Sequence, residues 1–241
     1  IMLAKETGEA VMNAVKNNIR PSDVITPKAV RNAVAVDNAI GASSNSVLHL
    51  LAVANEVGMS EKDFSVDTFN EVSAKVPHIC KLAPAGEHYI EDLNEAGGIS
   101  AVIKQLEDAG LFDGSAMTVS GVTQHERVKN ARVLDKEVIR PMDNPYSPTG
   151  GLAILKGNIA AEGAVVKKSA VDPAMLKHSG PAKVFDSEEA AMEAISTGKI
   201  VKGDVVVIRY EGPKGGPGMR EMLSPTSAIV GAGLGADVAL I

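Results

Sequence analysis

Cysteine is almost absent from this sequence, which contains a single one, Cys80, among 241 residues. One thiol cannot form an intramolecular disulfide, and this fits a reducing compartment. The chain by itself also cannot build a cysteine-ligated metal cluster, because such clusters take about four thiolates. Tryptophan is missing and aromatic residues make up 3% of the chain, so stacking platforms for nucleic-acid bases are not expected.

Positive charge is also sparse. The formal net charge is −6, and the densest basic pair is Lys167–Lys168. A nucleic-acid partner is not expected, since it would require a basic patch or stripe. No apolar run reaches the roughly 18 residues of a membrane span, and the N-terminus lacks the pattern of a signal peptide. We therefore expect a cytoplasmic protein with neither a membrane nor a nucleic acid as partner.

The residues that normally begin and end secondary structure are missing at both ends of the chain. Residues 1–17 show helical periodicity from the first position, with no N-cap before it. Residues 237–241, DVALI, resemble a buried strand that stops without a turn. We therefore expect the chain to be a piece of a longer protein.

The hydrophobic periodicity changes near Pro141. Before it, helices are predicted over residues 1–18, 28–40, 46–57, 65–75, 87–96 and 99–109, with a short strand over 79–82. Thr26 as N-cap and Pro27 at the first helical position mark the start of the second of these helices. After Pro141, short strands are predicted over residues 151–155, 163–168, 182–185, 204–210 and 238–241, with one helix over 187–197. Residues 141–151 include three prolines and two glycines, which is typical of a linker. The pattern indicates a helix-rich unit followed by a β-rich one.

The stretch Gly212–Ser227, GPKGGPGMREMLSPTS, is the most distinctive in the chain. Glycine lets a backbone or a ligand approach closely and proline fixes φ, so this loop is expected to have a defined shape. Glu221 follows three residues after its last glycine. A shaped loop that ends in a carboxylate can hold a cation or a small anionic substrate. Taken alone, however, the loop favours a tight surface turn between a strand and a helix.

A second candidate is the polar loop Gly41–Ser46, GASSNS, which leads into an apolar helix. Backbone N–H groups and hydroxyls at a helix N-terminus suit a carboxylate or a phosphate. Ordinary capping by Ser44 or Asn45 explains the same residues, and both interpretations stay open. The helix that follows is expected to be buried on several faces, with His49 as a hydrogen-bonded core residue.

Residues 77–92 contain two histidines, one thiol, a lysine and several carboxylates. His78 and Cys80 could share a metal ion, but no second Cys–His pair lies at zinc spacing. Cys80 is therefore predicted to be a buried structural thiol. The sequence has no nucleophile elbow, phosphate-binding P-loop or dinucleotide fingerprint.

Four long strings occur in order along the chain: GASSNSVLHLLAVANE, PHICKLAPAGEHYIEDLNEAGGI, PMDNPYSPTGGLAILKGNIAAEGAVVK and EGPKGGPGMREMLSPTSAI. Together they resemble the dihydroxy-acid dehydratase family, and the resemblance extends over essentially the whole chain. The wider family includes phosphogluconate and sugar-acid dehydratases. The unbroken GPKGGPGM followed by SPTSAI is more similar to the dihydroxy-acid branch.

The resemblance implies a hydro-lyase of branched-chain amino-acid synthesis, leading to valine, isoleucine and leucine. A 2,3-dihydroxy-3-methyl acid would lose water to give a 2-keto acid. In the family, an iron–sulfur cluster acts on the departing 3-hydroxyl, Mg²⁺ holds the substrate, and a serine alkoxide removes the C2 proton. These roles are chemically consistent, because hydroxide is a poor leaving group and a cation stabilises the developing enolate.

The family's functional residues carry over only in part. Its cluster cysteines, its carbamylated lysine and most of its magnesium-binding acids have no counterpart here, and its serine base is expected just beyond Ile241. Cys80 matches a position that is not a cluster ligand. By the resemblance, Glu221 is the one magnesium ligand in this chain. Substrate-loop candidates are Ser43, Ser44, Asn45, Gly215, Gly216 and Gly218, and the first loop departs from the usual Gly-Gly-Ser-Thr-Asn by reading Gly-Ala-Ser-Ser-Asn.

The resemblance also implies the fold. Residues 1–147 would be the helix-rich C-terminal part of a layered α/β domain. Residues 148–241 would be a truncated β/β/α swivelling domain with a barrel-like core. We expect an inactive fragment of an enzyme that forms a homodimer or a larger homo-oligomer and acts on a small dihydroxy acid. The alternatives are a sugar-acid or phosphogluconate dehydratase relative and a non-catalytic acid-binding module.

Overall fold

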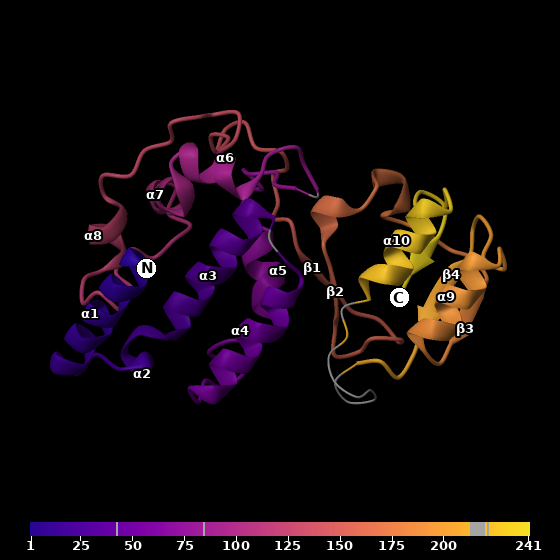
Figure 1. The fold of residues 1–241 in the computed structure, drawn as a ribbon, viewed down its shortest axis with the longest axis horizontal. Helices are drawn as coiled ribbons and strands as arrows, with labels where there is room; N and C mark the ends of the chain where they lie inside the picture. Colours follow the sequence, from indigo (N-terminus) through magenta and orange to yellow (C-terminus); the bar gives the residue numbers. More distant parts are fainter. Residues whose placement is uncertain (42, 84, 213–219, 221) are drawn as a thin grey trace. The chain divides into compact units, whose positions relative to one another are not determined.

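The computed structural model describes every residue of the chain except 42, 84, 213–219 and 221 (Figure 1). The chain divides into two compact units, Ile1–Ala170 and Val171–Ile241. The first unit is mostly helical, and the second combines a small sheet with helices. This confirms the mixed α/β class expected from the sequence.

Helix α3 (Pro27–Ile40) is the central element of the first unit. It begins as the sequence predicts, because the Thr26 hydroxyl accepts a hydrogen bond from a backbone N–H of the first turn and Pro27 occupies the first helical position. It ends at Gly41, whose φ of 60° lies in the left-handed region and whose N–H donates to the Asp37 carbonyl. The chain therefore turns sharply where the polar loop begins.

The remaining elements of the first unit are α1 (Met2–Lys16), α2 (Pro21–Val24), α4 (Asn45–Glu56), α5 (Asp67–Ser73), α6 (Ile90–Glu95), α7 (Gly98–Asp108), α8 (Gln124–Val128), β1 (Ala153–Leu155), β2 (Ala164–Val166) and a 3₁₀ turn, Lys168–Ala170. Among these, α4, α5 and α7 contact α3 directly. Strands β1 and β2 pair antiparallel, with Ala153 opposite Val166. Among the described residues, no helix is both long enough and apolar enough to cross a membrane.

Two hydrophobic clusters form the core of the first unit, and α3 contributes to both. Val30 and Val34 pack with residues of α4, α5 and β1, including the fully buried Phe69. Ala35 and Ala39 pack with residues of α6 and α7. Because apolar side chains leave α3 on two sides, this helix is held from both.

Two asparagines attach β1 to the helices. Asn38, which is fully buried in α3, accepts a hydrogen bond from the Leu152 N–H at 3.3 Å. In α5, Asn70 accepts from the Ile154 N–H and donates to the Ile154 carbonyl, both at 2.8 Å. The amide side chains thus supply the backbone partners that a neighbouring strand would otherwise provide.

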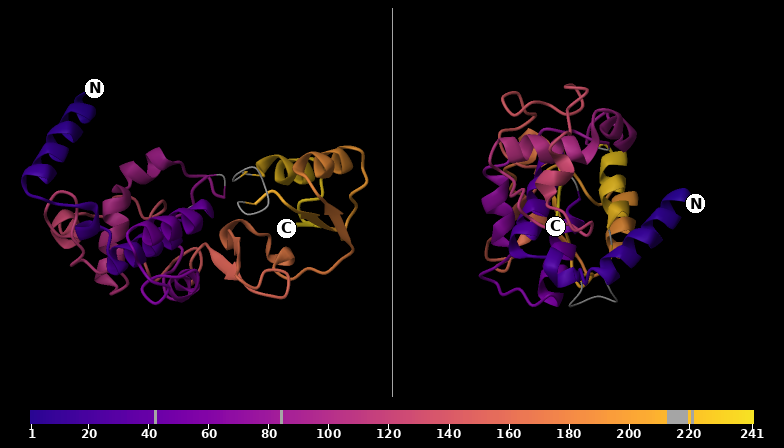
Figure 2. Two further views of the ribbon diagram at one scale, coloured as in Figure 1. Left: turned by 90° about the horizontal axis from the view of Figure 1, so that it is seen from below. Right: turned by 90° about the vertical axis from the view of Figure 1, so that its left-hand side faces the viewer.

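The second unit is built on a three-stranded parallel sheet, in the order β3 (Ala182–Phe185), β4 (Val205–Ile208) and β5 (Ala239–Leu240). Helices α9 (Glu188–Ser196) and α10 (Leu223–Gly231) pack together on one face of this sheet (Figure 2). A 3₁₀ turn, Pro173–Met175, lies before β3. The apolar core lies between sheet and helices and consists of Ala191, Ala194, Ile195, Ile200, Val206, Ile229 and Val238.

The predicted strand over residues 79–82 is wrong. The N–H groups of Ile79 and Cys80 both donate to the Ala39 carbonyl, at 2.8 and 3.1 Å. On the other side, the His78 N–H donates to the Ser147 carbonyl at 2.9 Å. The segment is therefore bonded to the end of α3 and to the linker, and not to a sheet.

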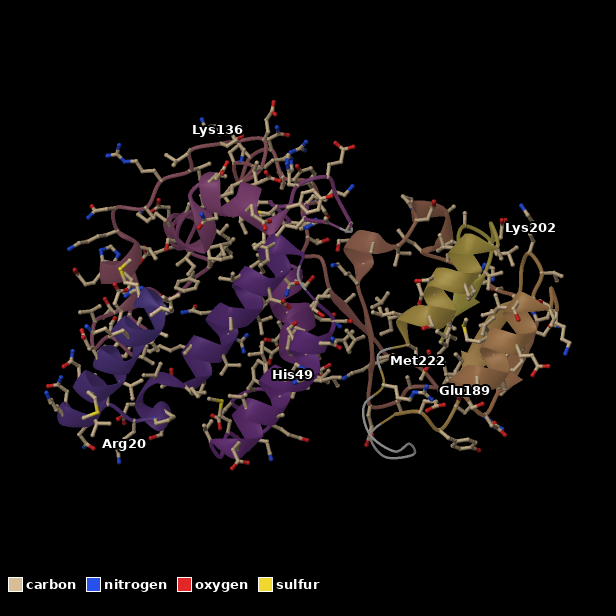
Figure 3. All side chains as sticks on the ribbon, viewed as in Figure 1. Arg20, His49, Lys136, Glu189, Lys202 and Met222 are labelled. Atoms are coloured by element: carbon tan, nitrogen blue, oxygen red, sulfur yellow. The ribbon has the colours of Figure 1, made fainter. Side chains whose placement is uncertain are left out.

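The expected burial of α4 is also wrong. Only Val47 and Ala54 are buried in this helix. His49 is exposed and not a core residue (Figure 3). Helix α8 was not predicted, because its five residues are too few to show a periodic signal. Helix α10 agrees with the turn between a strand and a helix that was expected in this region, since it follows β4 along the chain and begins five residues after Gly218.

Phe69→Ala tests the core between α3, α5 and β1. The Phe69 ring is fully buried and meets Phe64 edge to face, with ring centroids 5.6 Å apart. Removing it leaves a cavity, so the free energy of unfolding should fall by about 3–5 kcal/mol in urea denaturation. The exposed Tyr89→Ala is the control and should change stability by less than about 0.5 kcal/mol. Equal losses would contradict this packing.

Candidate functional site

The polar loop after α3 is ordered by its own residues. Ser43 is exposed, and Ser44 and Asn45 are half-buried. The Ser43 hydroxyl accepts a hydrogen bond from the Asn45 N–H at 3.2 Å, and the Ser43 carbonyl accepts from the Ser46 N–H at 3.1 Å. Ser44 occupies the N-cap position of α4, as one of the two suggestions from the sequence had it, but its side chain makes no capping hydrogen bond, and the Ser43 hydroxyl accepts from the first helical N–H instead. The first N–H groups of α4 already donate to acceptors within the loop. This favours ordinary capping of the helix over binding of an anion by these groups.

Asp37 and Ser46 also belong to this site, although the sequence did not single them out. The Ser46 Oγ lies 2.7 Å from Asp37 Oδ2 and 2.5 Å from the Ser43 carbonyl oxygen. The Asp37 side chain lies on the same face of α3 as Val30 and Val34, at helical spacing. That spacing is the signal that would have identified Asp37 as a carboxyl group on a buried stripe.

Burial dominates the electrostatics of Asp37, which is 8% exposed. Burial raises the pKa of its carboxyl to about 6, against the opposing effects of hydrogen bonding to Ser46 and of the positive charge of Lys167. The folded protein therefore keeps the proton of Asp37 up to a higher pH than the unfolded chain does. The contribution of Asp37 to the free energy of unfolding is therefore fully present at pH values below the ordinary pKa of aspartate. It is lost as the pH rises through about 6.

The backbone around Gly41 is packed too closely for a side chain. A Cβ at position 41 would collide with the imidazole of His78, and one on Gly151 would lie 2.8 Å from the Gly41 Cα. His78 is buried, and burial lowers its pKa, with Lys81 and Lys167 adding to the effect and a backbone hydrogen bond to Cys80 opposing it. The ring is therefore neutral at pH 7, and its role is to pack against the loop at Gly41.

Cys80, two residues after His78 in the sequence, is fully buried. Burial raises the pKa of its thiol to about 12, so the group stays protonated and is a poor nucleophile and metal ligand. The prediction of a buried structural thiol is confirmed. Among the described residues, no group of three or more His, Cys, Asp or Glu side chains is placed to hold a metal ion.

In the second unit, an ion cluster lies beside the glycine-rich loop. Arg220 Nη2 lies 2.7 Å from Glu188 Oε2 and 2.9 Å from Glu189 Oε1, and Nη1 lies 3.1 Å from Glu211 Oε1. Figure 3 marks Glu189 at the start of α9 and Met222 immediately before α10. The carboxylates raise the pKa of the Arg220 guanidinium above its ordinary value. One cation thus holds together segments on both sides of the loop.

The ion cluster is partly buried, so its charges matter more for the stability of the protein than those of an exposed ion pair. Glu211 is 7% exposed and Glu188 is 9% exposed, and the Glu188 N–H also donates to Glu211 Oε1 at 3.0 Å. Buried carboxylates are costly unless a cation and hydrogen bonds compensate them. A hollow of about 700 Å³ beside the cluster is lined by Glu188, Glu189, Met192, Arg220 and Ser224.

Several predicted site residues lie outside the described part of the chain. These are Glu221, Gly215, Gly216 and Gly218. Of the substrate-loop candidates, Ser43, Ser44 and Asn45 are described, and they lie together between α3 and α4. The two candidate loops belong to different units. In the first unit the groups at hand are hydroxyls, a buried carboxyl and Lys167, which suit binding of a polar acid better than bond breaking.

Known proteins are similar to this sequence along its whole length. A model of the dihydroxy-acid/6-phosphogluconate dehydratase N-terminal domain matches residues 1–127, and one of the C-terminal domain matches residues 137–241. Dihydroxy-acid dehydratase of Acetivibrio thermocellus is 63% identical over 241 residues, that of Agathobacter rectalis 60%, and that of Caldanaerobacter subterraneus 59%. All of this chain is covered in each comparison, and the chain spans 43% of the length of each relative.

Gly41→Ala tests the close packing of the loop, with Gly58→Ala as its control. Both glycines have positive φ, 60° and 78°, but a Cβ on Gly58 meets open space. The backbone term should cost each variant about 1–2 kcal/mol. The collision with His78 should add about 1–3 kcal/mol for Gly41→Ala alone. Urea denaturation measures both, and equal losses would show that His78 does not press on Gly41.

Arg220→Gln tests the ion cluster, with Arg209→Gln as its control. Arg209 pairs with the exposed Asp186 at 2.6 Å, whereas Arg220 compensates two buried carboxylates. Loss of Arg220 should therefore lower the Tm of the protein clearly more than loss of Arg209. Differential scanning calorimetry measures both, and matching Tm values would mean that the cluster adds nothing beyond a surface pair.

Proposed function

The chain belongs to the dihydroxy-acid/6-phosphogluconate dehydratase family, and we propose on this premise that the protein containing it is a dihydroxy-acid dehydratase. The observation that carries the proposal is the 63% identity to such an enzyme along all 241 residues. The reaction is the loss of water from a 2,3-dihydroxy-3-methyl acid to give a 2-keto acid. This step belongs to the synthesis of valine, isoleucine and leucine.

The parent enzyme is proposed to use an iron–sulfur cluster and Mg²⁺, as the family does. The described residues of this chain do not fit either group. The one thiol is buried and protonated, and the described residues form no cluster of metal ligands. We therefore assign no catalytic step to them, and we propose that this chain alone is inactive, with the serine base supplied beyond Ile241.

Two contributions to the active site are proposed for this chain. Glu221 is a magnesium ligand, by its place in the string GPGMRE. The loop residues Ser43, Ser44 and Asn45 contact the acid substrate, together with the glycines of the second loop, Gly215, Gly216 and Gly218. The ordered polar loop, whose backbone is held by its own hydrogen bonds, supports the second assignment.

The domain organisation proposed from the sequence places the boundary between residues 147 and 148. The start of the C-terminal family model at residue 137 supports a second domain in this region. We propose that the first part belongs to a layered α/β domain and that the second is a swivelling, barrel-like β/β/α domain. The parent enzyme is proposed to be a cytoplasmic homodimer or larger homo-oligomer.

A sugar-acid or phosphogluconate dehydratase is the second candidate, because the matching family models cover 6-phosphogluconate dehydratases as well. To decide between the two candidates, the turnover rates of the full-length protein are compared for 2,3-dihydroxy-3-methyl acids and for phosphogluconate. A non-catalytic acid-binding module would instead bind 2-keto and dihydroxy acids in calorimetry without converting them.

Glu221→Gln in the full-length enzyme tests the proposed magnesium ligand. Loss of one carboxylate should lower turnover at fixed Mg²⁺ at least about 100-fold, because ligand loss costs more than the loss of an outer partner. The visible absorption of the iron–sulfur cluster should stay unchanged. Glu95→Gln, at an exposed position of α6, is the control. An unaltered magnesium dependence would refute the role of Glu221.

A further inference from the structure

Three oxygen atoms at the polar loop form a chain of two short contacts, with Ser46 Oγ between the other two. The Ser43 carbonyl oxygen lies 2.5 Å from Ser46 Oγ, which lies 2.7 Å from Asp37 Oδ2. Separations this short are those of O–H···O hydrogen bonds, so each gap needs a proton. The Ser46 hydroxyl supplies one proton, while a carbonyl and an ionised carboxylate supply none. One proton is missing unless Asp37 carries it.

We propose that Asp37 is a positioning residue that holds the substrate loop as a neutral carboxylic acid. Its proton is donated to Ser46 Oγ, which frees the Ser46 hydroxyl to donate to the Ser43 carbonyl. The carboxyl group thus fixes the backbone at Ser43 through Ser46. The substrate assigned to this loop rests on the proposed function, but the location of the proton does not.

The surroundings of Asp37 decide how firmly the proton is held. Lys167 is the charged group whose field reaches Asp37, and it favours the ionised form. His78, beyond Gly41, is neutral for the reasons given above. Asp37 also borders a hollow of about 360 Å³, whose other lining residues are all uncharged. Burial therefore outweighs the single cation, in agreement with a pKa of about 6.

A proton on Asp37 matters for binding an acid. An ionised Asp37 would place a negative charge directly behind the loop that receives the substrate carboxylate, and like charges disfavour each other in a buried setting. Binding of the anion therefore favours protonation of Asp37. By linkage, the full-length protein takes up a proton from solution when the acid binds above pH 6.

The experiment compares four forms of the full-length enzyme: wild type, Asp37→Asn, Ser46→Ala and Asp143→Asn. An asparagine at position 37 donates to Ser46 as the acid does but never ionises. Asp143 is exposed, so its substitution controls for loss of one negative charge. The KM for a 2,3-dihydroxy-3-methyl acid is measured from about pH 5.5 to about pH 8, and proton uptake is measured by calorimetry in buffers of different ionisation enthalpy.

In the wild type and in Asp143→Asn, KM should rise by up to about tenfold per pH unit above pH 6, with proton uptake on binding. In Asp37→Asn, KM should be low and independent of pH over this range, without uptake. Ser46→Ala should raise KM several-fold at every pH, because the link to Ser43 is cut. A wild-type KM in Ser46→Ala, or a wild-type pH profile in Asp37→Asn, would overturn the positioning role.

A second measurement locates the proton without turnover. Infrared difference spectra of wild type against Asp37→Asn should contain the band of a protonated carboxyl group at about pH 5.5, and that band should fade by about pH 8. Absence of the band at the lower pH overturns the inference, whatever the substrate. If the band is present but no dihydroxy acid is turned over by the wild type, the proposed function fails and the proton on Asp37 stands.

Discussion

The close approach of three segments of the chain at Gly41, namely the end of α3, the His78 side chain and the backbone at Gly151, is the constraint on which the first unit depends. Helix α3 is buried against two hydrophobic clusters, so its end cannot move without disturbing both. At that end, the His78 ring fills the space that a side chain at position 41 would need, and the Gly41 Cα fills the space that a side chain on Gly151 would need. The loop that follows, its capping serine and the carboxyl of Asp37 are thereby kept at fixed distances from one another.

Periodicity and capping residues predicted most of the elements because these signals are local. Thr26 and Pro27 marked the start of α3, and Gly41 stands at its end, all through backbone chemistry that a few neighbouring residues determine. Residues 79–82 were mistaken for a strand because their apolar pattern is the same whether the partner is a strand or a helix end. The burial of α4 was overestimated since an apolar helix sequence does not say whether each of its faces has a neighbour.

The functional groups were harder to predict because their chemistry depends on distant residues. Ser43 and Asn45 were found because they lie in a polar loop before an apolar helix and in a string that resembles a family. Asp37 instead acquires its properties from burial and from Lys167, which lies 130 positions further along the chain. Arg220 is unremarkable in sequence, yet it compensates two buried glutamates. A partly buried ion cluster of this kind forms only when distant segments fold together, so it has no local signature in the sequence.

The asparagines that hold β1 also affect how the first unit folds. Asn38 and Asn70 bond to residues 114 and 84 positions further along the chain. Helices form within about a microsecond, but contacts across such separations require closure of long loops before they return any stability. We therefore expect attachment of β1 to be a late event in the folding of this unit. On the ribosome, α3 and α5 emerge well before residues 152–154, so Asn38 and Asn70 lack these backbone partners until that segment has been synthesised.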